Sequence, residues 1–161
     1  VTMLDLDSQV IAQSLDWVRS GQTVWLCTVL STYGSSPRVP GAMLVARSDG
    51  KYVGSLSGGC VENDFIARLK EGAFFQPTTL VRYGETRAEE LRLALPCGGI
   101  LEILVERRES GTDWLNHLVK LHATRLGQQR LVRKVEPGTG ECEVIRRATC
   151  YPNAEQYPYS N

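Results

Sequence analysis

The chain has 161 residues, a formal net charge of zero and 22% charged residues, a balance that argues against nucleic acid or an anionic membrane as the main partner. It contains no apolar run of the ~18 residues that a transmembrane helix needs, and its acidic first residues do not resemble a signal peptide. We therefore expect a cytoplasmic location and reduced thiols for its cysteines, which are Cys27, Cys60, Cys97, Cys142 and Cys150.

The first predicted elements are a helix and a strand. Apolar residues recur at helical spacing in Ser8–Ser20, and Gly21 is expected to end this helix. Thr23–Thr32 is rich in β-branched and aromatic residues and predicts a strand. Cys27 lies in the middle of this strand, where a cysteine usually behaves as a small buried hydrophobe, so we expect its role to be structural.

A loop is predicted for residues 34–41, which contain two prolines, two glycines and two serines. This composition excludes regular structure. Two interpretations of Arg38 stay open. The loop is either a connecting turn with a solvated arginine or a stiff loop that carries Arg38 to a bound anion, because the guanidinium fork suits phosphate.

The next stretch predicts a hairpin that leads into a helix. Ala42–Arg47 and Lys51–Ser57 have strand patterns and are joined by Ser48-Asp49-Gly50, and Asp-Gly is a strong hairpin signal. Apolar residues between Val61 and Leu69 have helical spacing, and Gly72 stands where a C-terminal cap is expected.

The first candidate site is Gly58-Gly59-Cys60, at the point where this helix begins. A helix N-terminus carries free amides and a partial positive charge, so it favours anions and lowers the pKa of a thiol. The alternative is a buried thiol that caps the helix, and the residues alone do not decide between the two. The helix dipole by itself accounts for a carboxylate such as Glu62 in the first turn.

A second cysteine beside two glycines occurs at Cys97-Gly98-Gly99. It leads into Ile100–Glu106, whose alternating pattern predicts a strand, and it comes after the predicted strand Thr78–Tyr83. The charged residues 84–94, between these two strands, are consistent with a loop, a helical turn or both. The alternative for Cys97 is a tight turn into the strand that follows.

The last predicted elements are a helix and a hairpin. Thr112–Arg125 is expected to be a helix, and His117 and His122 are five residues apart on it. They do not have the i, i+4 spacing of a metal-binding pair, so we expect both to be surface or partly buried residues. Gln129–Val135 and Glu141–Arg147 are expected to form the two strands of the hairpin.

Together these elements predict a single α/β domain with a mixed β-sheet of about six or seven strands and about three helices. The P-loop, nucleophile-elbow and zinc-protease motifs are missing from the sequence. A cysteine hydrolase would need a histidine base, and the sequence shows no route from either histidine to Cys60.

Three motifs taken together resemble one known family. They are Gly34-Ser35-Ser36-Pro37-Arg38-x-x-Gly41-Ala42, Gly54-Ser55-Leu56-Ser57-Gly58-Gly59-Cys60-Val61-Glu62, and Cys97-Gly98-Gly99 with a strand that ends at Glu106. In this order and at these separations they resemble the N-terminal domain of the XdhC/CoxI family, which are accessory proteins for molybdenum hydroxylases such as xanthine dehydrogenase. The resemblance covers residues 21–147. It implies that residues 1–150 form this domain, that residues 151–161 are a polar tail or linker, and that the family's C-terminal Rossmann-like domain is absent.

The resemblance implies an accessory chaperone rather than an enzyme. Such a protein would bind the molybdenum cofactor (molybdopterin), hold it while a cysteine desulfurase provides its terminal sulfur, and deliver it to the apo-molybdenum hydroxylase. A homodimer is left open. Cys60 and Cys97 would contact molybdenum or a persulfide. The residues that the resemblance places at the cofactor are Arg38, Ser57, Gly58, Gly59, Cys60, Glu62, Cys97, Gly98 and Gly99.

A second class of function is also consistent with these residues. The chain would then be a thiol-redox or nucleotide-binding oxidoreductase domain. In that interpretation Cys60 and Cys97 form a disulfide, or the glycine turn holds a nucleotide. The absorption spectrum and the metal content of the purified protein discriminate between the two classes.

Overall fold

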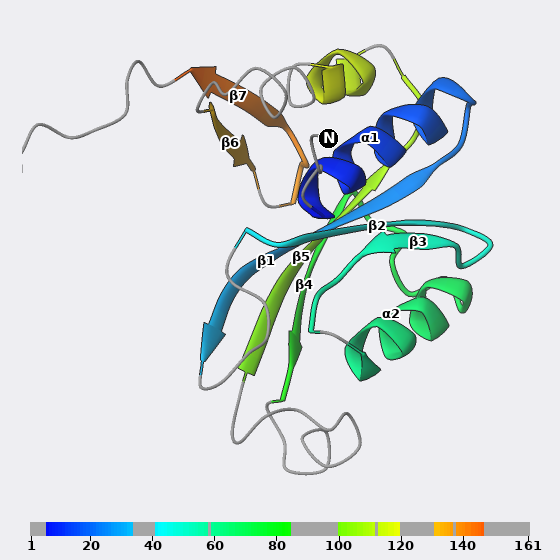
Figure 1. Ribbon diagram of the computed structural model, residues 1–161, viewed down its shortest axis with the longest axis vertical. Helices are drawn as coiled ribbons and strands as arrows, with labels where there is room; N and C mark the ends of the chain where they lie inside the picture. The colour runs from blue at the N-terminus through cyan, green and yellow to red at the C-terminus, as the bar shows by residue number, and fades with distance from the viewer. Residues whose placement is uncertain are drawn as a thin grey trace, which may run out of the picture.

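A computed structural model describes residues 6–33, 41–57, 59–84, 100–111, 113–119, 131–136 and 138–146. A short helix at residues 113–119 is drawn in Figure 1 without a label. The labelled elements, in chain order, are α1 (Leu6–Arg19), β1 (Val24–Tyr33), β2 (Met43–Arg47), β3 (Tyr52–Gly54), α2 (Cys60–Lys70), β4 (Thr78–Tyr83), β5 (Ile100–Arg108), β6 (Leu131–Val135) and β7 (Cys142–Arg146).

The strands form two sheets. The main sheet has five strands in the order β3-β2-β1-β5-β4, and β6 pairs with β7 in a separate sheet of two strands. Helices and a β-sheet occur together in the described residues, so the α/β class is confirmed. All pairings among the described strands are antiparallel, so the expected mixed pairing is not found. The expected strands are present, but they are divided between the two sheets, so the main sheet has fewer strands than predicted.

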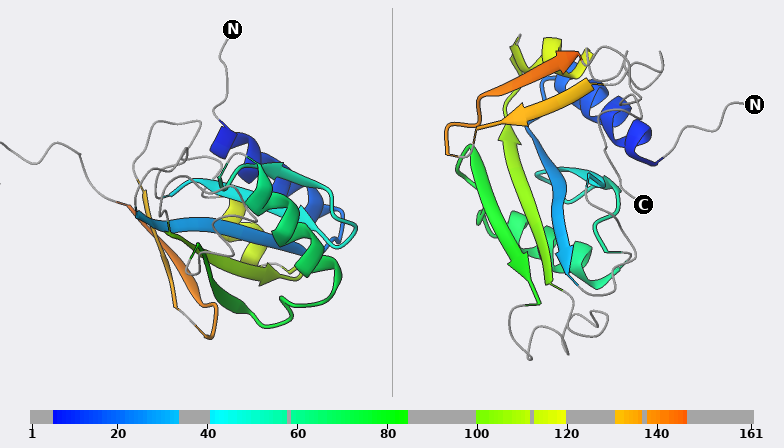
Figure 2. Two further views of the ribbon diagram at one scale, coloured as in Figure 1. Left: turned by 90° about the horizontal axis from the view of Figure 1, so that it is seen from below. Right: turned by 90° about the vertical axis from the view of Figure 1, so that its left-hand side faces the viewer.

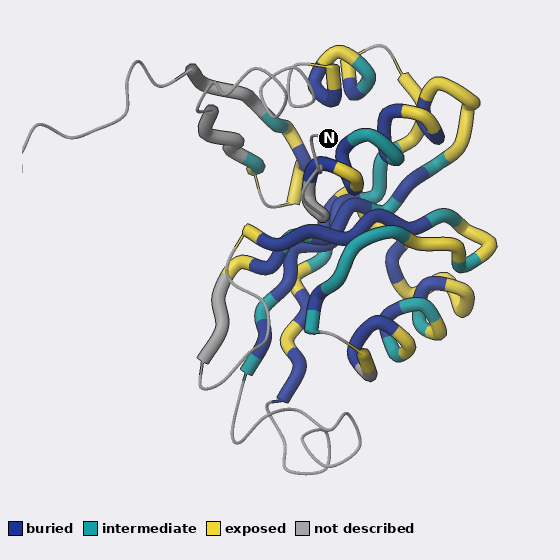
Figure 3. Tube along the Cα trace, in the orientation of Figure 1, coloured by how far each residue is buried: buried dark blue, intermediate teal, exposed yellow. Residues whose placement is uncertain are grey.

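The main sheet is covered on both faces, as Figure 2 shows. Because side chains alternate along a strand, residues of β1 contribute in turn to two separate cores. Cys27 and Val29 join the core under α2, while Val24 and Leu26 join the core under α1 and the helix at 113–119. Figure 3 shows that the buried residues run along the middle of the sheet and the inner sides of α1 and α2. Cys27 is fully buried, as predicted.

The β2–β3 hairpin forms at the predicted Asp-Gly turn. Asp49 accepts hydrogen bonds from the Arg47 side chain and from the Lys51 amide, and Gly50 has a φ of 89°. The strand β3 ends at Gly54, three residues earlier than the predicted end. The amide of Ser55 still donates to the Met43 carbonyl oxygen of β2, but the amides of Leu56 and Ser57 donate to the Glu62 side chain of α2 and not to a neighbouring strand.

The β6–β7 hairpin lies across the end of the main sheet where β5 finishes (Figure 2, right). The amide of Gly138 donates a hydrogen bond of 2.8 Å to Oγ1 of Thr78. A cavity of about 780 Å³ adjoins this contact, and Arg108, Trp114 and His117 are among its lining residues. His117 is buried and stacks on Trp114 with ring centroids 5.1 Å apart, so it is less exposed than predicted.

Candidate functional site

The described residues beside the three motifs lie toward one end of the main sheet. Tyr33 of β1 pairs with Ile100 of β5, so the loop that begins after Tyr33 and the motif that precedes Ile100 meet the sheet at the same end. The strand β3 is antiparallel to β2, which is antiparallel to β1. The chain that leaves β3 at Gly54 therefore runs toward this same end.

The structure describes only part of the predicted site. Arg38, Gly58, Cys97, Gly98 and Gly99 lie outside the described residues, and Cys60 is described only as the first residue of α2. That the Gly58-Gly59-Cys60 and Cys97-Gly98-Gly99 motifs form one site therefore stays a prediction. The predicted site residues that are described with their contacts are Ser57, Gly59 and Glu62.

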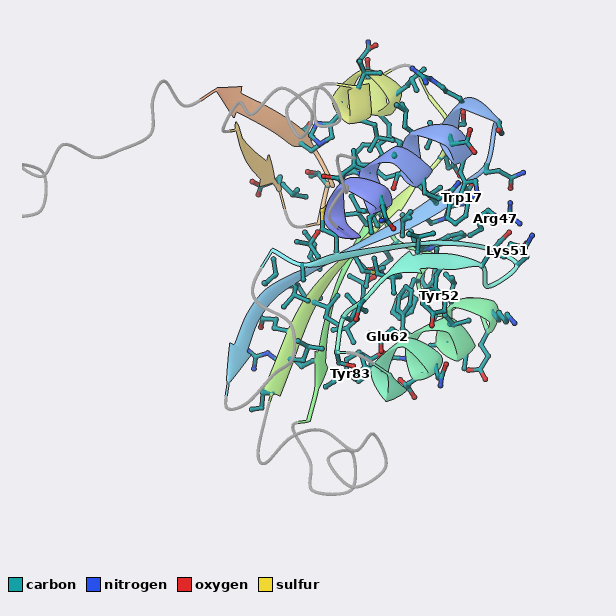
Figure 4. All side chains as sticks on the ribbon, viewed as in Figure 1. Trp17, Arg47, Lys51, Tyr52, Glu62 and Tyr83 are labelled. Carbon is teal, nitrogen blue, oxygen red and sulfur yellow. The ribbon has the colours of Figure 1, made fainter. Side chains whose placement is uncertain are left out.

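Glu62 is the centre of the described part of the site. Its Oε1 accepts hydrogen bonds from Oγ of Ser55 (3.2 Å), from the amide of Leu56 (2.6 Å) and from the amide of Ser57 (2.8 Å). Its Oε2 accepts from Oγ of Ser57 (3.2 Å) and from the amide of Gly59 (2.8 Å). One side chain thus binds four residues of the turn that precedes α2, and Figure 4 shows Glu62 between this turn and the helix.

The Glu62 carboxylate is buried, with 3% of the residue exposed. Burial is the largest single influence on the pKa of Glu62 and raises it. Hydrogen bonds from the amides of Ser57, Leu56 and Gly59 and from its own amide lower the pKa by more in total, so it lies below the ordinary value. Hydrogen bonds to the charged form stabilise that form. Glu62 is therefore ionised at neutral pH.

This geometry changes what an anion would find at the start of α2. The amides of Leu56, Ser57 and Gly59 already donate to Glu62, and the carboxylate offsets the partial positive charge of the helix N-terminus. The first amides of an α-helix still have no intrahelical acceptor. An anion at this turn would depend on those amides and on a cation from elsewhere, the role expected of Arg38.

Close packing holds three points of the chain around the turn, which are Gly54, Leu56 and Val61. At Gly54, which has a φ of 110°, a side chain would come within 2.3 Å of the Met43 carbonyl oxygen, so only glycine fits between the strands. Leu56 is fully buried in the core under α2. Val61, in the first turn of α2, is also fully buried, so the turn spans a short distance between fixed points.

Sequence reasoning did not single out Ser55 or the acceptor role of Glu62. The acceptor role of Glu62 toward Gly59 could have been found from their spacing, since a glutamate three residues after an N-cap reaches back to the N-cap amide. This contact is the observed bond to the Gly59 amide. The further bonds to Ser55, Leu56 and Ser57 depend on how the chain returns from β3, which no local pattern specifies.

Among the residues that the structure describes, no three histidine, cysteine or acidic side chains are grouped so that they could hold a metal ion. Cys27 lies in the core, and burial, together with the charge of Glu106, raises the pKa of its thiol. It is therefore unsuited to binding a metal as a thiolate. No helix within the described residues is both long and apolar enough to cross a membrane.

The sequence around the turn that precedes α2 matches a known protein family. The sequence model of the XdhC and CoxI family matches residues 17–84, a segment that includes β1, the β2–β3 hairpin, the turn and α2. The resemblance is thereby confirmed for residues 17–84, which contain the first two motifs, whereas Cys97-Gly98-Gly99 lies outside the matched segment.

Two curated relatives have similar sequences. The chain is 30% identical over 112 residues to the molybdenum cofactor insertion chaperone PaoD of Escherichia coli, covering 70% of this chain and 35% of PaoD. It is 32% identical over 84 residues to a probable xanthine dehydrogenase subunit of Bacillus subtilis, covering 51% of this chain and 26% of that protein.

A solved structure has a similar fold. A crystal structure of a xanthine dehydrogenase from Bacillus halodurans superposes with a TM-score of 0.63 and 25% sequence identity, covering 85% of this chain and 42% of that one. The chain thus spans about a third of the length of PaoD and a smaller share of the Bacillus subtilis protein. The similarity concerns one part of these longer proteins.

Proposed function

We propose that this chain belongs to the machinery that inserts the molybdenum cofactor into a hydroxylase of the xanthine dehydrogenase type. In this role it holds the cofactor while a cysteine desulfurase supplies the terminal sulfur, and it then delivers the cofactor to the apo-enzyme. The chain acts as a chaperone rather than as an enzyme. The names of its relatives and the confirmed family segment support this role.

The single observation that carries the proposal is the turn held by Glu62. Gly59 and Cys60 stand at the start of α2, and the chain leaves β3 toward the end of the sheet where β1 ends and β5 begins, which supports a shared site for the three motifs. A thiol at a helix N-terminus is a ligand suited to molybdenum or to a persulfide sulfur. In this proposal Cys60 and Cys97 provide the thiols, and Arg38 binds the phosphate of the cofactor.

The first experiment measures whether the protein retains the cofactor. Protein purified from molybdenum-supplied cells is expected to contain molybdenum and to show pterin absorbance, because the cofactor carries both. Protein from cells that cannot make molybdopterin is the matched control and is expected to show neither. If the two preparations have the same spectrum and the same metal content, the proposed function is wrong.

A second experiment tests the thiols. Cys60→Ser and Cys97→Ser are each expected to fold normally and to lower cofactor retention at least about tenfold, a factor that corresponds to ~1.4 kcal/mol of binding free energy. Cys27→Ser is the matched control. It places a hydroxyl in the core, where Cys27 is fully buried, so it is expected to lower the melting temperature while the folded protein retains the cofactor.

The outcomes of the thiol experiment distinguish three cases. Full retention and full transfer by both serine variants at the site would refute the thiol mechanism. A loss of retention that only follows the loss of folding, as judged by thermal melts, would also refute it. A disulfide between Cys60 and Cys97 in the isolated protein, without pterin absorbance, would favour the thiol-redox alternative.

A further inference from the structure

We propose that Glu62 is a positioning residue, whose carboxylate fixes residues 55–57 and Gly59 and thereby the place of Cys60, and that it does not itself touch the cofactor. The fixing of the turn follows from the hydrogen bonds of this chain alone. The consequence for the cofactor rests on the proposed function. The two parts are tested by separate measurements.

Direct contact between Glu62 and a ligand is disfavoured, because hydrogen-bond donors of the turn already occupy the oxygens of its carboxylate. A carboxylate offers about four lone-pair positions, and among the described residues Ser55, Leu56, Ser57 and Gly59 alone donate five hydrogen bonds to Glu62. The residue is only 3% exposed. A cofactor at the surface of the turn would therefore meet the backbone and the side chains around Cys60, with the carboxylate beneath them.

Apolar packing alone does not determine the conformation of the turn. The core holds Leu56 and Val61, both fully buried, but packing does not orient the amides between them, because Ser57 is half-buried and Gly59 is exposed. Glu62 provides the acceptor for these two amides, at 2.8 Å to each. Because Cys60 follows Gly59 directly, the bond to the Gly59 amide is the last constraint on the backbone before the thiol-bearing residue.

The two oxygens of Glu62 have separate tasks, and this separation gives a specific test. Oε1 accepts from the amides of Leu56 and Ser57, whereas Oε2 accepts from the amide of Gly59. In Glu62→Gln the remaining carbonyl oxygen can keep the first two bonds, while the new NH₂ group faces the Gly59 amide and cannot accept from it. In Glu62→Ala all three bonds are lost.

The test is amide hydrogen exchange measured by NMR on folded protein, well below the melting temperature and without cofactor. In Glu62→Gln we expect exchange of the Gly59 amide to accelerate at least about tenfold, while the Leu56 and Ser57 amides stay slow. In Glu62→Ala we expect all three to accelerate by at least that factor. Glu71→Gln, at the exposed C-terminal end of α2, is the matched control and is expected to leave the three amides unchanged.

Cofactor retention is the second readout, measured per folded molecule. We expect retention to fall at least about tenfold in Glu62→Ala, to fall less in Glu62→Gln, and to stay at the wild-type level in Glu71→Gln. A purely structural role would lower the melting temperature without this graded loss among folded molecules. The graded order is therefore the signature of positioning.

Three results would overturn the proposal. The first is slow exchange of the Gly59 amide in both Glu62 variants, and the second is equal acceleration of all three amides in Glu62→Gln. The third is wild-type retention of the cofactor by a Glu62→Ala protein whose turn has lost its protection. If the wild-type protein itself retains no cofactor, the proposed function fails, but the exchange measurement still decides whether Glu62 fixes the turn.

Discussion

Gly54 and Gly72 both have a positive φ, of 110° and 82°, but their surroundings differ. A Cβ at Gly54 would come within 2.3 Å of the Met43 carbonyl oxygen and 2.7 Å of the Leu44 Cα, both of them backbone atoms that cannot move aside. A Cβ at Gly72 would meet nothing within 4 Å. The same substitution therefore has two different costs.

We expect Gly54→Ala to destabilise the protein by about 3 kcal/mol or more, because backbone strain and overpacking add. Gly72→Ala carries only the cost of the left-handed conformation, about 1–2 kcal/mol. Denaturant unfolding of the two variants beside the wild type measures the difference. Equal losses in the two variants would contradict the close approach of β2 at Gly54.

The ionised state of Glu62 makes stability depend on pH. Its folded-state pKa lies below the ordinary value of 4.5, so its contribution is fully present above pH 4.5 and is lost as the pH falls through the lower, folded-state pKa. Glu62→Gln cannot lose a proton. We therefore expect the difference in unfolding free energy between the wild type and this variant to be constant near neutral pH and to shrink in acid. A difference that stays constant down to pH ~3 would contradict the claim that Glu62 is ionised and hydrogen-bonded in the folded protein.

At the scale of elements, two neighbouring phenylalanines after α2 show how the helix is held. Phe74 is 2% exposed and stacks on Phe65 with ring centroids 5.0 Å apart, while Phe75 is 72% exposed. We expect Phe74→Ala to cost about 3–5 kcal/mol through lost burial and the cavity that remains. Phe75→Ala is expected to change stability by less than about 0.5 kcal/mol, and thermal melts of the pair check both values.

Local patterns were sufficient to predict most elements. The strand β4 has the predicted bounds, and the Asp-Gly turn and the C-terminal glycine of α2 stand where the sequence places them. The pairing of the strands was not predictable in the same way. Antiparallel neighbours can be distant in sequence, as β1 and β5 are, and side-chain periodicity does not specify which strands meet or in which direction.

The site was predictable only in part, and Glu62 shows why. The helix dipole already explains why a glutamate occurs in the first turn of a helix. The sequence therefore does not indicate that Glu62 also accepts bonds from Ser55, Leu56 and Ser57. Those bonds depend on how the chain returns from β3 to α2, which is a matter of tertiary structure. His117 was misjudged for a similar reason, since its stacking on Trp114 depends on the packing of a whole helix against the sheet.

At the scale of the whole molecule, the two ends of the main sheet differ in what they present. Arg47 lies at the end where the β2–β3 turn pairs it with Asp49 and where its guanidinium contacts Trp17, and Figure 4 shows it far from Glu62. Arg38 lies outside the described residues and follows in the sequence after Tyr33, the last residue of β1, so we expect it at the opposite end of the sheet. Two arginines of the same charge thus offer a matched comparison.

We expect Arg38→Ala to lower cofactor retention at least about tenfold, because a guanidinium–phosphate pair is a strong, charge-assisted contact. Arg47→Ala removes the same charge from the other end of the sheet and is expected to leave retention unchanged. Molybdenum content per protein, measured for both variants after identical purification, checks the pair. Equal retention in the two variants would contradict the prediction that Arg38 binds the cofactor.

The bonds between Glu62 and the turn before α2 also have a kinetic consequence. Because these bonds lie within one chain, the turn loses its conformational entropy when the protein folds, and an arriving ligand does not have to order it. We therefore expect association without a slow ordering step of the turn. The heat-capacity change on binding should reflect only the apolar surface that the ligand itself covers, without the larger change that accompanies coupled folding.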